Sequence, residues 1–241
     1  WDVKNKIRFG PLTSIISMNR IEGYRFRTGF WTLPGISKKT NINAYLAYGT
    51  KDQLWKGKVG MKYIWNAVRW TKTSMSYSSD YDLLNINADE LDNDNILTSV
   101  SRKNLTAKRI FIKNAEIKHE QFINSNWSAN STFSYKEIKP SFDFGYYSLQ
   151  SSMANILDSS IHSTLPVSEC TLGFRYAHNE STTIFNYENI KLSTYYPIFT
   201  LNFIHGIPMS KNMFTYNKFI MNLQQWMRIP PKFLLYYKLE A

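Results

Sequence analysis

The segment Leu54–Trp65, with the sequence LWKGKVGMKYIW, alternates between two kinds of side chain along its length. One set of alternate positions carries aromatic or apolar residues: Trp55, Val59, Met61, Tyr63 and Trp65. The positions between them are Lys56, Lys58, Gly60 and Lys62. A period of two is that of a β-strand whose two faces meet different surroundings. Strict alternation over about ten residues is longer than an average globular strand and matches a tilted membrane-spanning strand.

Two preceding segments show the same pattern. In Tyr24–Thr32, aromatic residues alternate with Arg25 and Arg27, and in Thr40–Tyr48 apolar residues alternate with asparagines. A Pro-Gly turn lies between the two segments. Aromatic residues gather near the strand ends, where membrane barrels carry their interfacial girdles; they are Tyr45, Tyr48, Trp55 and Trp65.

The rest of the chain adds weaker strand patterns and long polar stretches. Further strands are predicted over residues 68–77, 109–122, 126–136, 167–178, 195–206, 216–227 and 233–241. Long loops are predicted over residues 79–104 and 140–165, and a single helical turn over residues 12–18. The total is about ten strands with short turns alternating with long loops. We therefore expect an all-β fold: one antiparallel transmembrane β-barrel domain over residues 1–241, part of a larger barrel and truncated at both ends.

Composition narrows the class of protein. The chain is 43% hydrophobic, yet no run approaches the roughly 18 apolar residues of a transmembrane helix, so a helical membrane protein is excluded. A single cysteine, Cys170, excludes an internal disulfide framework. We expect any secretion signal to lie outside this sequence.

The formal net charge of +11 raises the question of an anionic partner. The basic residues are spread singly through the strands and form no basic arm, so nucleic acid is not expected as a partner. A cation-lined lumen, or a rim beside anionic lipopolysaccharide, accounts for the same charge.

The alternation assigns side chains to two environments. The residues predicted to face lipid are Tyr24, Phe26, Phe30, Ile42, Leu46, Trp55, Val59, Met61, Tyr63, Trp65, Phe199, Leu201, Phe203, Phe219, Met221 and Leu223. The residues predicted to face the lumen are Glu22, Arg25, Arg27, Lys56, Lys58, Lys62 and Arg175. Because charges inside a barrel generally pair, we expect Glu22 to contact Arg25 or Arg27.

The sequence offers little catalytic chemistry. The four histidines are scattered without metal-binding spacing, so no metal or other cofactor is expected. His178, next to Asn179, Glu180 and Ser181 at a strand end, is the best candidate for a catalytic base. No G-x-S-x-G motif accompanies it, so a histidine at the barrel rim is the favoured interpretation and an enzyme is not expected.

Two segments carry a resemblance to a known family. Asn19–Arg27 reads NRIEGYRFR and Ala44–Asp52 reads AYLAYGTKD. Looser matches follow at Ser168-Glu169, Phe174–His178, Tyr196-Pro197 and Tyr216–Lys218. Together they resemble a Bacteroidota outer-membrane family that joins an N-terminal carboxypeptidase-regulatory-like β-sandwich to a C-terminal barrel domain of unknown function. The chain departs from that pattern in lacking the sandwich and a glycine-rich end, which we interpret as truncation. The resemblance implies an outer-membrane location and a barrel fold. It implies no peptidase activity, because the carboxypeptidase-regulatory-like sandwich is non-catalytic.

The expected function is that of an integral outer-membrane barrel with a structural, transport or membrane-assembly role. Expected partners are outer-membrane lipid, lipopolysaccharide, and another outer-membrane barrel or a surface lipoprotein. Two alternatives stay open. One is a soluble β-sandwich that binds glycans through exposed aromatics, since a sandwich strand also alternates. The other is a barrel hydrolase that uses His178.

Overall fold

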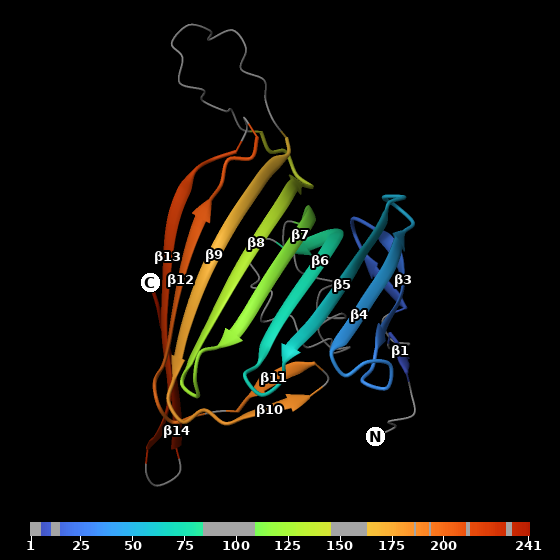
Figure 1. Cartoon of the computed structure of the whole chain (residues 1–241). Coiled ribbons are helices and arrows are strands. Elements are labelled where there is room, and N and C mark those ends of the chain that lie inside the picture. The colour runs from blue at the N-terminus through green and yellow to red at the C-terminus, as the bar shows by residue number, and fades with distance from the viewer. Residues whose placement is uncertain are drawn as a thin grey trace, which may run out of the picture.

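The computed structural model describes residues 6–10, 15–83, 109–145, 163–185, 187–192, 194–210, 213–229 and 233–241, and the fold is all-β (Figure 1). Within these residues no helix is long and apolar enough to cross a membrane. Twelve strands form one antiparallel sheet and two form a separate hairpin.

The first half of the main sheet pairs strands in chain order. Its strands are β1 (Ile7–Phe9), β2 (Ile16–Asn19), β3 (Gly23–Thr32), β4 (Thr40–Gly49), β5 (Trp55–Asn66), β6 (Thr71–Leu83) and β7 (Arg109–Phe122). β1 and β2 both pair with β3, on different parts of its length.

The second half continues the sheet and sets the hairpin aside. Its strands are β8 (Trp127–Pro140), β9 (Leu165–Ala177), β12 (Ile198–Gly206), β13 (Tyr216–Ile229) and β14 (Phe233–Glu240). The hairpin strands are β10 (Thr182–Phe185) and β11 (Glu188–Lys191), inserted between β9 and β12, which pair directly with each other.

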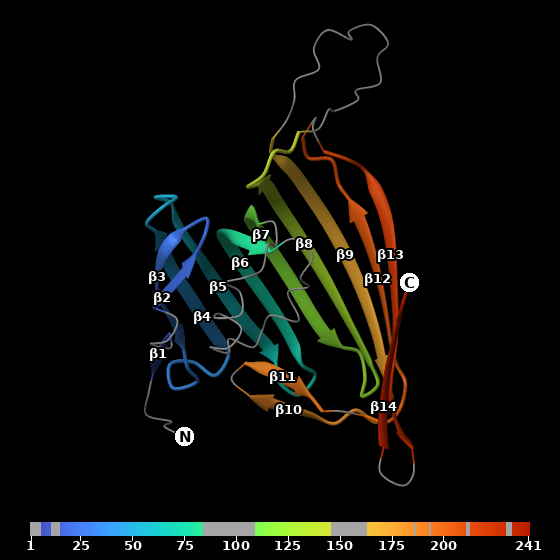
Figure 2. The same cartoon turned by 180° about the vertical axis from the view of Figure 1, so that it is seen from behind.

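The sheet curves into a tall open trough, and the β10–β11 hairpin lies across its lower end (Figures 1 and 2). Contacts identify the concave face: Arg25 on β3 reaches Asp80 on β6 at 2.6 Å. In a flat sheet, strands three apart lie about 14 Å from each other, so these two side chains meet because the sheet bends toward them.

The alternation of the sequence becomes two faces with different chemistry. Across β3 to β6, Phe30, Ala44, Val59 and Tyr77 are aligned partners and lie on the convex face. The residues between them, such as Lys58, point to the concave face. Strand β5 is 12 residues long and β7 is 14, so the predicted strand length is present in the structure.

Several sequence predictions were wrong. Residues 79–83 belong to β6 and not to a loop, because Ser79 to Leu83 pair with Lys113 to Arg109. The part of the 12–18 segment that is described begins strand β2 at Ile16 and is not a helical turn, since backbone pairing with β3 satisfies its polar groups. The ten expected strands are all present, but four short strands, β1, β2, β10 and β11, were missed, so fourteen are described. The two end residues of the second predicted loop, Pro140 and Leu165, belong to β8 and β9. Residues 84–104 and 146–162 of the two predicted loops lie outside the described residues.

The sheet is open in the described residues, whereas the sequence predicted a barrel. The β1/β2 edge and β14 pair only on their inner sides and not with each other. An antiparallel all-β sheet is therefore what the structure establishes, and closure stands as a proposal below.

Candidate functional site

The concave face carries two groups of charged side chains, one near each end of the trough. Glu22 is the centre of the upper group and lies in the turn between β2 and β3. The turn brings Gly23 to a φ of 70°, a left-handed conformation that glycine adopts without strain. Asn19 holds the carboxylate in place, donating a hydrogen bond from Nδ2 to Glu22 Oε2 at 2.6 Å.

Three cations surround the Glu22 carboxylate. Lys56 Nζ lies 2.5 Å from it, and Arg25 and Arg109 follow at 3.2 and 3.7 Å. Lys56 also contacts Asp52 at 2.6 Å. A buried charge is costly unless it is paired, so this arrangement explains how Glu22 and Lys56 can both be buried.

The upper group extends across the sheet through Asp80. Its carboxylate accepts hydrogen bonds from Arg25 and from the Tyr45 hydroxyl, the latter at 2.6 Å. The Arg27 guanidinium lies 4.0 Å from the centre of the Tyr45 ring. Of the two arginines expected to pair with Glu22, the structure therefore places Arg25 on the carboxylate and Arg27 on Tyr45.

The lower group attaches the hairpin to the sheet. Glu188 on β11 forms ion pairs with Lys62 on β5 and with Lys72 on β6, the latter at 2.8 Å. Burial alone would raise the pKa of Glu188, but hydrogen bonds from the two lysines outweigh burial and hold the pKa below its ordinary value. The carboxylate therefore stays charged at neutral pH.

An aromatic anchor adds to this attachment. Tyr187, in the turn just before β11, is buried against Ile64 and Trp70, with Phe122 beside them. Its hydroxyl donates a hydrogen bond to the Ser37 carbonyl. This small cluster is the buried apolar core among the described residues, and it lies between the hairpin and the sheet.

The base of the hairpin is also tied to β9. Arg175 holds Glu180 through two hydrogen bonds of 2.5 and 2.6 Å. A cavity of about 250 Å³ remains between the hairpin and strands β3 to β5, lined by Asn41, Asn43 and Lys62 among others. The hairpin thus narrows the lower end of the trough and leaves polar space beside it.

His178, the candidate catalytic base, packs against neighbouring residues of the chain. Its ring packs edge-on against Tyr196, with centroids 4.7 Å apart, and its carbonyl accepts a hydrogen bond from Thr194. Glu180 is engaged by Arg175 and does not orient the imidazole. No group of His, Cys, Asp and Glu within the described ranges could hold a metal ion.

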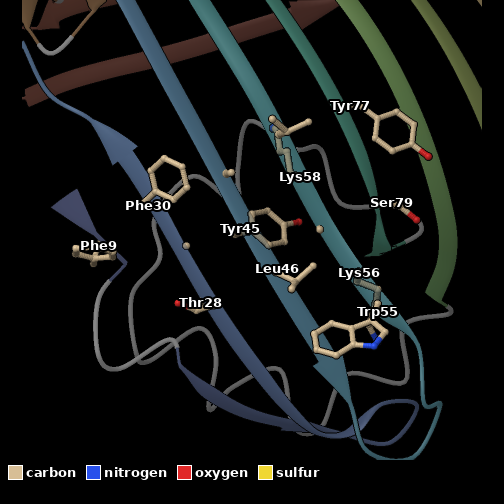
Figure 3. A pocket seen from close by; sticks show the side chains of 14 residues that line it. Phe9, Thr28, Phe30, Tyr45, Leu46, Trp55, Lys56, Lys58, Tyr77 and Ser79 are labelled. Carbon is tan, nitrogen blue, oxygen red and sulfur yellow. The ribbon is translucent and has the colours of Figure 1, made fainter. Parts of the chain in front are cut away.

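The convex face has a groove of about 530 Å³ over β3 to β6 (Figure 3). Phe9, Phe30, Leu46 and Trp55 surround it, and small residues, among them Thr28 and Gly57, line it. The exposed surface of the groove is mostly apolar, although Lys56, Lys58 and Ser79 also border it. The groove therefore suits a hydrocarbon chain better than a polar molecule.

The predicted lipid-facing and lumen-facing residues fall on opposite faces. Lys56, Lys62, Arg25, Arg27 and Arg175 lie on the concave side in the contacts above. Sequence reasoning missed Asp52, Asp80, Lys72 and Glu188. The acidic residues Asp52, Asp80 and Glu188 belong to no alternating segment that the sequence showed, since they come from a turn, a strand end and the inserted hairpin.

Comparison with known proteins gives a family without an assigned activity. No curated protein matches the chain. The model of the C-terminal domain of a family of unknown function, DUF5686, matches residues 2–241. That match spans every described strand, including both halves of the sheet and the hairpin. The chain therefore belongs to the DUF5686 family, of which it represents the C-terminal domain.

Proposed function

We propose that this chain forms the wall of a bacterial outer-membrane β-barrel and acts without catalysis, in a structural, transport or membrane-assembly role. The main supporting observation is that charged side chains are buried while large apolar side chains are exposed. Glu22 and Lys56 are 0% and 1% exposed, whereas Trp55 and Phe219 are 66% and 65% exposed.

That distribution suits lipid better than water. A water-soluble protein rarely exposes large apolar patches, and charged residues are rarely fully buried. Here exposed large apolar residues lie on the convex face from β3 to β14, among them Phe26, Met61, Met75, Phe174 and Leu235. Hydrocarbon against this face removes the cost of exposing it.

The aromatic residues support a membrane boundary at each end. At the lower end Trp65 donates a hydrogen bond to Thr73, which also contacts His119, and Trp127 packs on Tyr176. Such residues combine an apolar body with a polar tip, as interfacial residues do. The upper end has the Tyr48–Trp55 pair.

The two longest connections lie at one end of the sheet, as they do in outer-membrane barrels, although the upper end also has the short connection 50–54 and the lower end has the longer connection 178–197 that contains the hairpin. At the lower end β5–β6 and β7–β8 are joined by residues 67–70 and 123–126. At the upper end β6–β7 and β8–β9 are joined through residues 84–108 and 141–164. Outer-membrane barrels have short turns on the periplasmic side and long loops on the extracellular side, so the lower end would face the periplasm.

Closure is a requirement of the proposal. In lipid every backbone polar group needs an internal partner, so the β1/β2 edge and β14 must pair with each other or with further strands. The convex face would then contact lipid and lipopolysaccharide, with another barrel or a surface lipoprotein as protein partner. The Bacteroidota origin and the N-terminal sandwich remain implications of the resemblance.

The two alternative functions lack a supporting feature. A soluble sandwich needs a second sheet over the apolar face, and within the described residues none covers the convex side. A hydrolase needs a nucleophile beside its base, and the described contacts of His178 are with Tyr196 and Thr194.

Adjacent positions on β6 test the proposal. Met75 lies on the convex face and Ser76 on the concave face. Met75→Arg should destabilise the protein in lipid vesicles by about 2–4 kcal/mol, and Ser76→Arg by much less. Urea titration with heat-modifiable gel migration measures both. Equal effects, or a monodisperse protein without detergent, would refute the membrane assignment.

A further inference from the structure

The two open edges of the main sheet run in the same direction. Neighbouring strands are antiparallel at every step of the described path, so the direction alternates from β1 and β2 through β3 to β14 (Figure 1). β3 runs from the upper end to the lower end, so β1 and β2, which both pair with it, run upward. β13 runs downward from Tyr216 to Ile229, so its partner β14 also runs upward.

This shared direction restricts how the sheet can close. The described path has eleven positions, with β2 placed beside β1 on β3, and an odd number of alternating strands begins and ends in the same direction. Joining β14 directly to the β1/β2 edge would therefore make a parallel pair. Bacterial outer-membrane barrels consist of an even number of antiparallel strands. Antiparallel closure thus needs an odd number of further strands, and the strand next to each open edge must run downward.

The outer edge of β14 is suited to pairing with such a strand. Ala241 and Met221 exchange both backbone hydrogen bonds, at 2.9 and 3.0 Å. Because inward and outward backbone groups alternate along an antiparallel strand, residues 234, 236, 238 and 240 direct their N–H and C=O groups away from β13. Leu235 and Leu239 are exposed between them on the convex face. A regular apolar edge of this kind is a template for another strand, and in hydrocarbon its backbone groups need partners.

A second copy of the chain does not supply the downward strand. Copies inserted in one membrane with the same orientation are related by rotation about the membrane normal, which leaves an upward strand upward. The open edges of each copy in the described structure are β14 and β1/β2, and both run upward. Every edge-to-edge pairing between copies would therefore be parallel again.

The order of the strands favours the same polypeptide as the source. From β3 to β14, each strand of the sheet lies beside the next one in sequence, apart from the β10–β11 hairpin inserted between β9 and β12. Such sequential pairing with short connections is the common arrangement in proteins. β14 stops at the upper end, where a following antiparallel strand would start. β1 starts at the lower end, where a preceding antiparallel strand would stop.

We propose that a downward strand of the same protein, from outside residues 1–241, pairs with β14, and that an odd number of such strands joins β14 to the β1/β2 edge. One strand is the smallest number that meets this condition. The inference rests on the proposed function, because it specifies what completes the barrel wall. The residues of the strand would alternate between apolar side chains toward lipid and polar side chains toward the lumen.

Photo-cross-linking of the full-length protein in its native outer membrane identifies the neighbour of each edge. p-Benzoylphenylalanine replaces Lys238 on β14 or Ser17 on β2, and mass spectrometry identifies the linked peptides. Each position should link to its known neighbour, β13 or β3, and to a second peptide from outside residues 1–241. The matched control replaces Gln224 on β13, which should link only to β12 and β14.

Every other second peptide overturns the proposal. A peptide from β1 or β2 at position 238 would mean direct closure, and one from residues 84–108 or 146–162 would mean that the 241 residues close the sheet themselves. A peptide from a different protein would mean that a partner supplies the strand. The absence of a second peptide at both edges would mean that the edges stay open.

Cysteine pairs in a Cys170→Ser background measure the spacing of the edges independently. A disulfide needs Cα atoms within about 7 Å, whereas one intervening strand separates β14 from the β1/β2 edge by about 10 Å. Cysteines at 224 and 238 should form a disulfide, because β13 and β14 are neighbours. Pairs between 233–240 and 7–9 or 16–19 should form none, and any that forms overturns the proposal. If the Met75 and Ser76 variants still behave as expected, only the inference about closure fails.

Discussion

Lys56→Met removes the cation that lies between Glu22 and Asp52 at the upper end of the trough. Lys56 Nζ is 2.5 Å from the first carboxylate and 2.6 Å from the second. Methionine fills a similar volume but brings no charge. Two carboxylates would then share a site from which water is largely excluded.

The expected cost follows from that burial. Breaking a buried ion pair by removing one partner typically costs about 3–5 kcal/mol, because the other charge is left uncompensated. Arg25 still contacts Glu22 at 3.2 Å, which limits the loss at that carboxylate. The double variant Glu22→Gln with Lys56→Met should cost about 1–3 kcal/mol less than the sum of the two single changes, since the partners interact directly.

Urea unfolding in lipid vesicles, followed by tryptophan fluorescence, measures these free energies. Lys58→Met on the same strand serves as control and should change stability by about 0.5 kcal/mol or less, as an exposed surface substitution does. If Lys56→Met costs no more than Lys58→Met, or if the double variant is additive, the buried ion-pair network does not stabilise the sheet.

Three further outcomes are expected. Tyr187→Ala should release the β10–β11 hairpin while the main sheet stays intact, at a local cost of about 3–5 kcal/mol. Hydrogen exchange should then increase only in residues 187–191, and faster exchange over the whole sheet would contradict the prediction. Because the pKa of Glu188 is lowered in the folded state, its contribution to hairpin attachment should be complete above the ordinary carboxyl pKa of about 4.3 and be lost as pH falls below that value. Limited proteolysis across this pH range should show faster cleavage of the hairpin at low pH, with Glu188→Gln as the pH-insensitive control. Gly23→Ala should cost about 1–2 kcal/mol, because alanine at a φ of 70° is strained and its Cβ would lie 2.8 Å from the Thr50 hydroxyl. Gly57→Ala, which adds a crowded Cβ without a positive φ, measures the steric effect alone, and an unchanged unfolding midpoint for Gly23→Ala would contradict the prediction.

Much of the sheet could be predicted from the sequence because strand alternation is a local property. Thr40–Tyr48 stops one residue before the end of β4, and Leu54–Trp65 differs from β5 by one residue at each end. The face of each charged residue follows from the same periodicity, so Lys56 and Lys62 could be placed without coordinates. Strong patterns such as these depend on the immediate neighbours alone.

The hairpin could not be predicted, because its position depends on contacts far along the chain. Glu188 meets Lys62 and Lys72, which precede it by 126 and 116 residues. Its strands have four residues each, too few to establish a period. Likewise Asp80 lay in a polar stretch that resembled a loop, and its role depends on Arg25 and Tyr45 reaching it across the curved sheet.

The most direct test of the account is the environment of successive residues along β5. Nitroxide labels at positions 57 to 62, introduced one at a time in a Cys170→Ser background, report access to oxygen dissolved in lipid and to a nickel chelate dissolved in water. The account predicts that positions 57, 59 and 61 are most accessible to oxygen and that 58, 60 and 62 favour the chelate or are protected from both. Labels at 59 and 61 that meet the water-soluble chelate as readily as labels at 58 and 62 would contradict it.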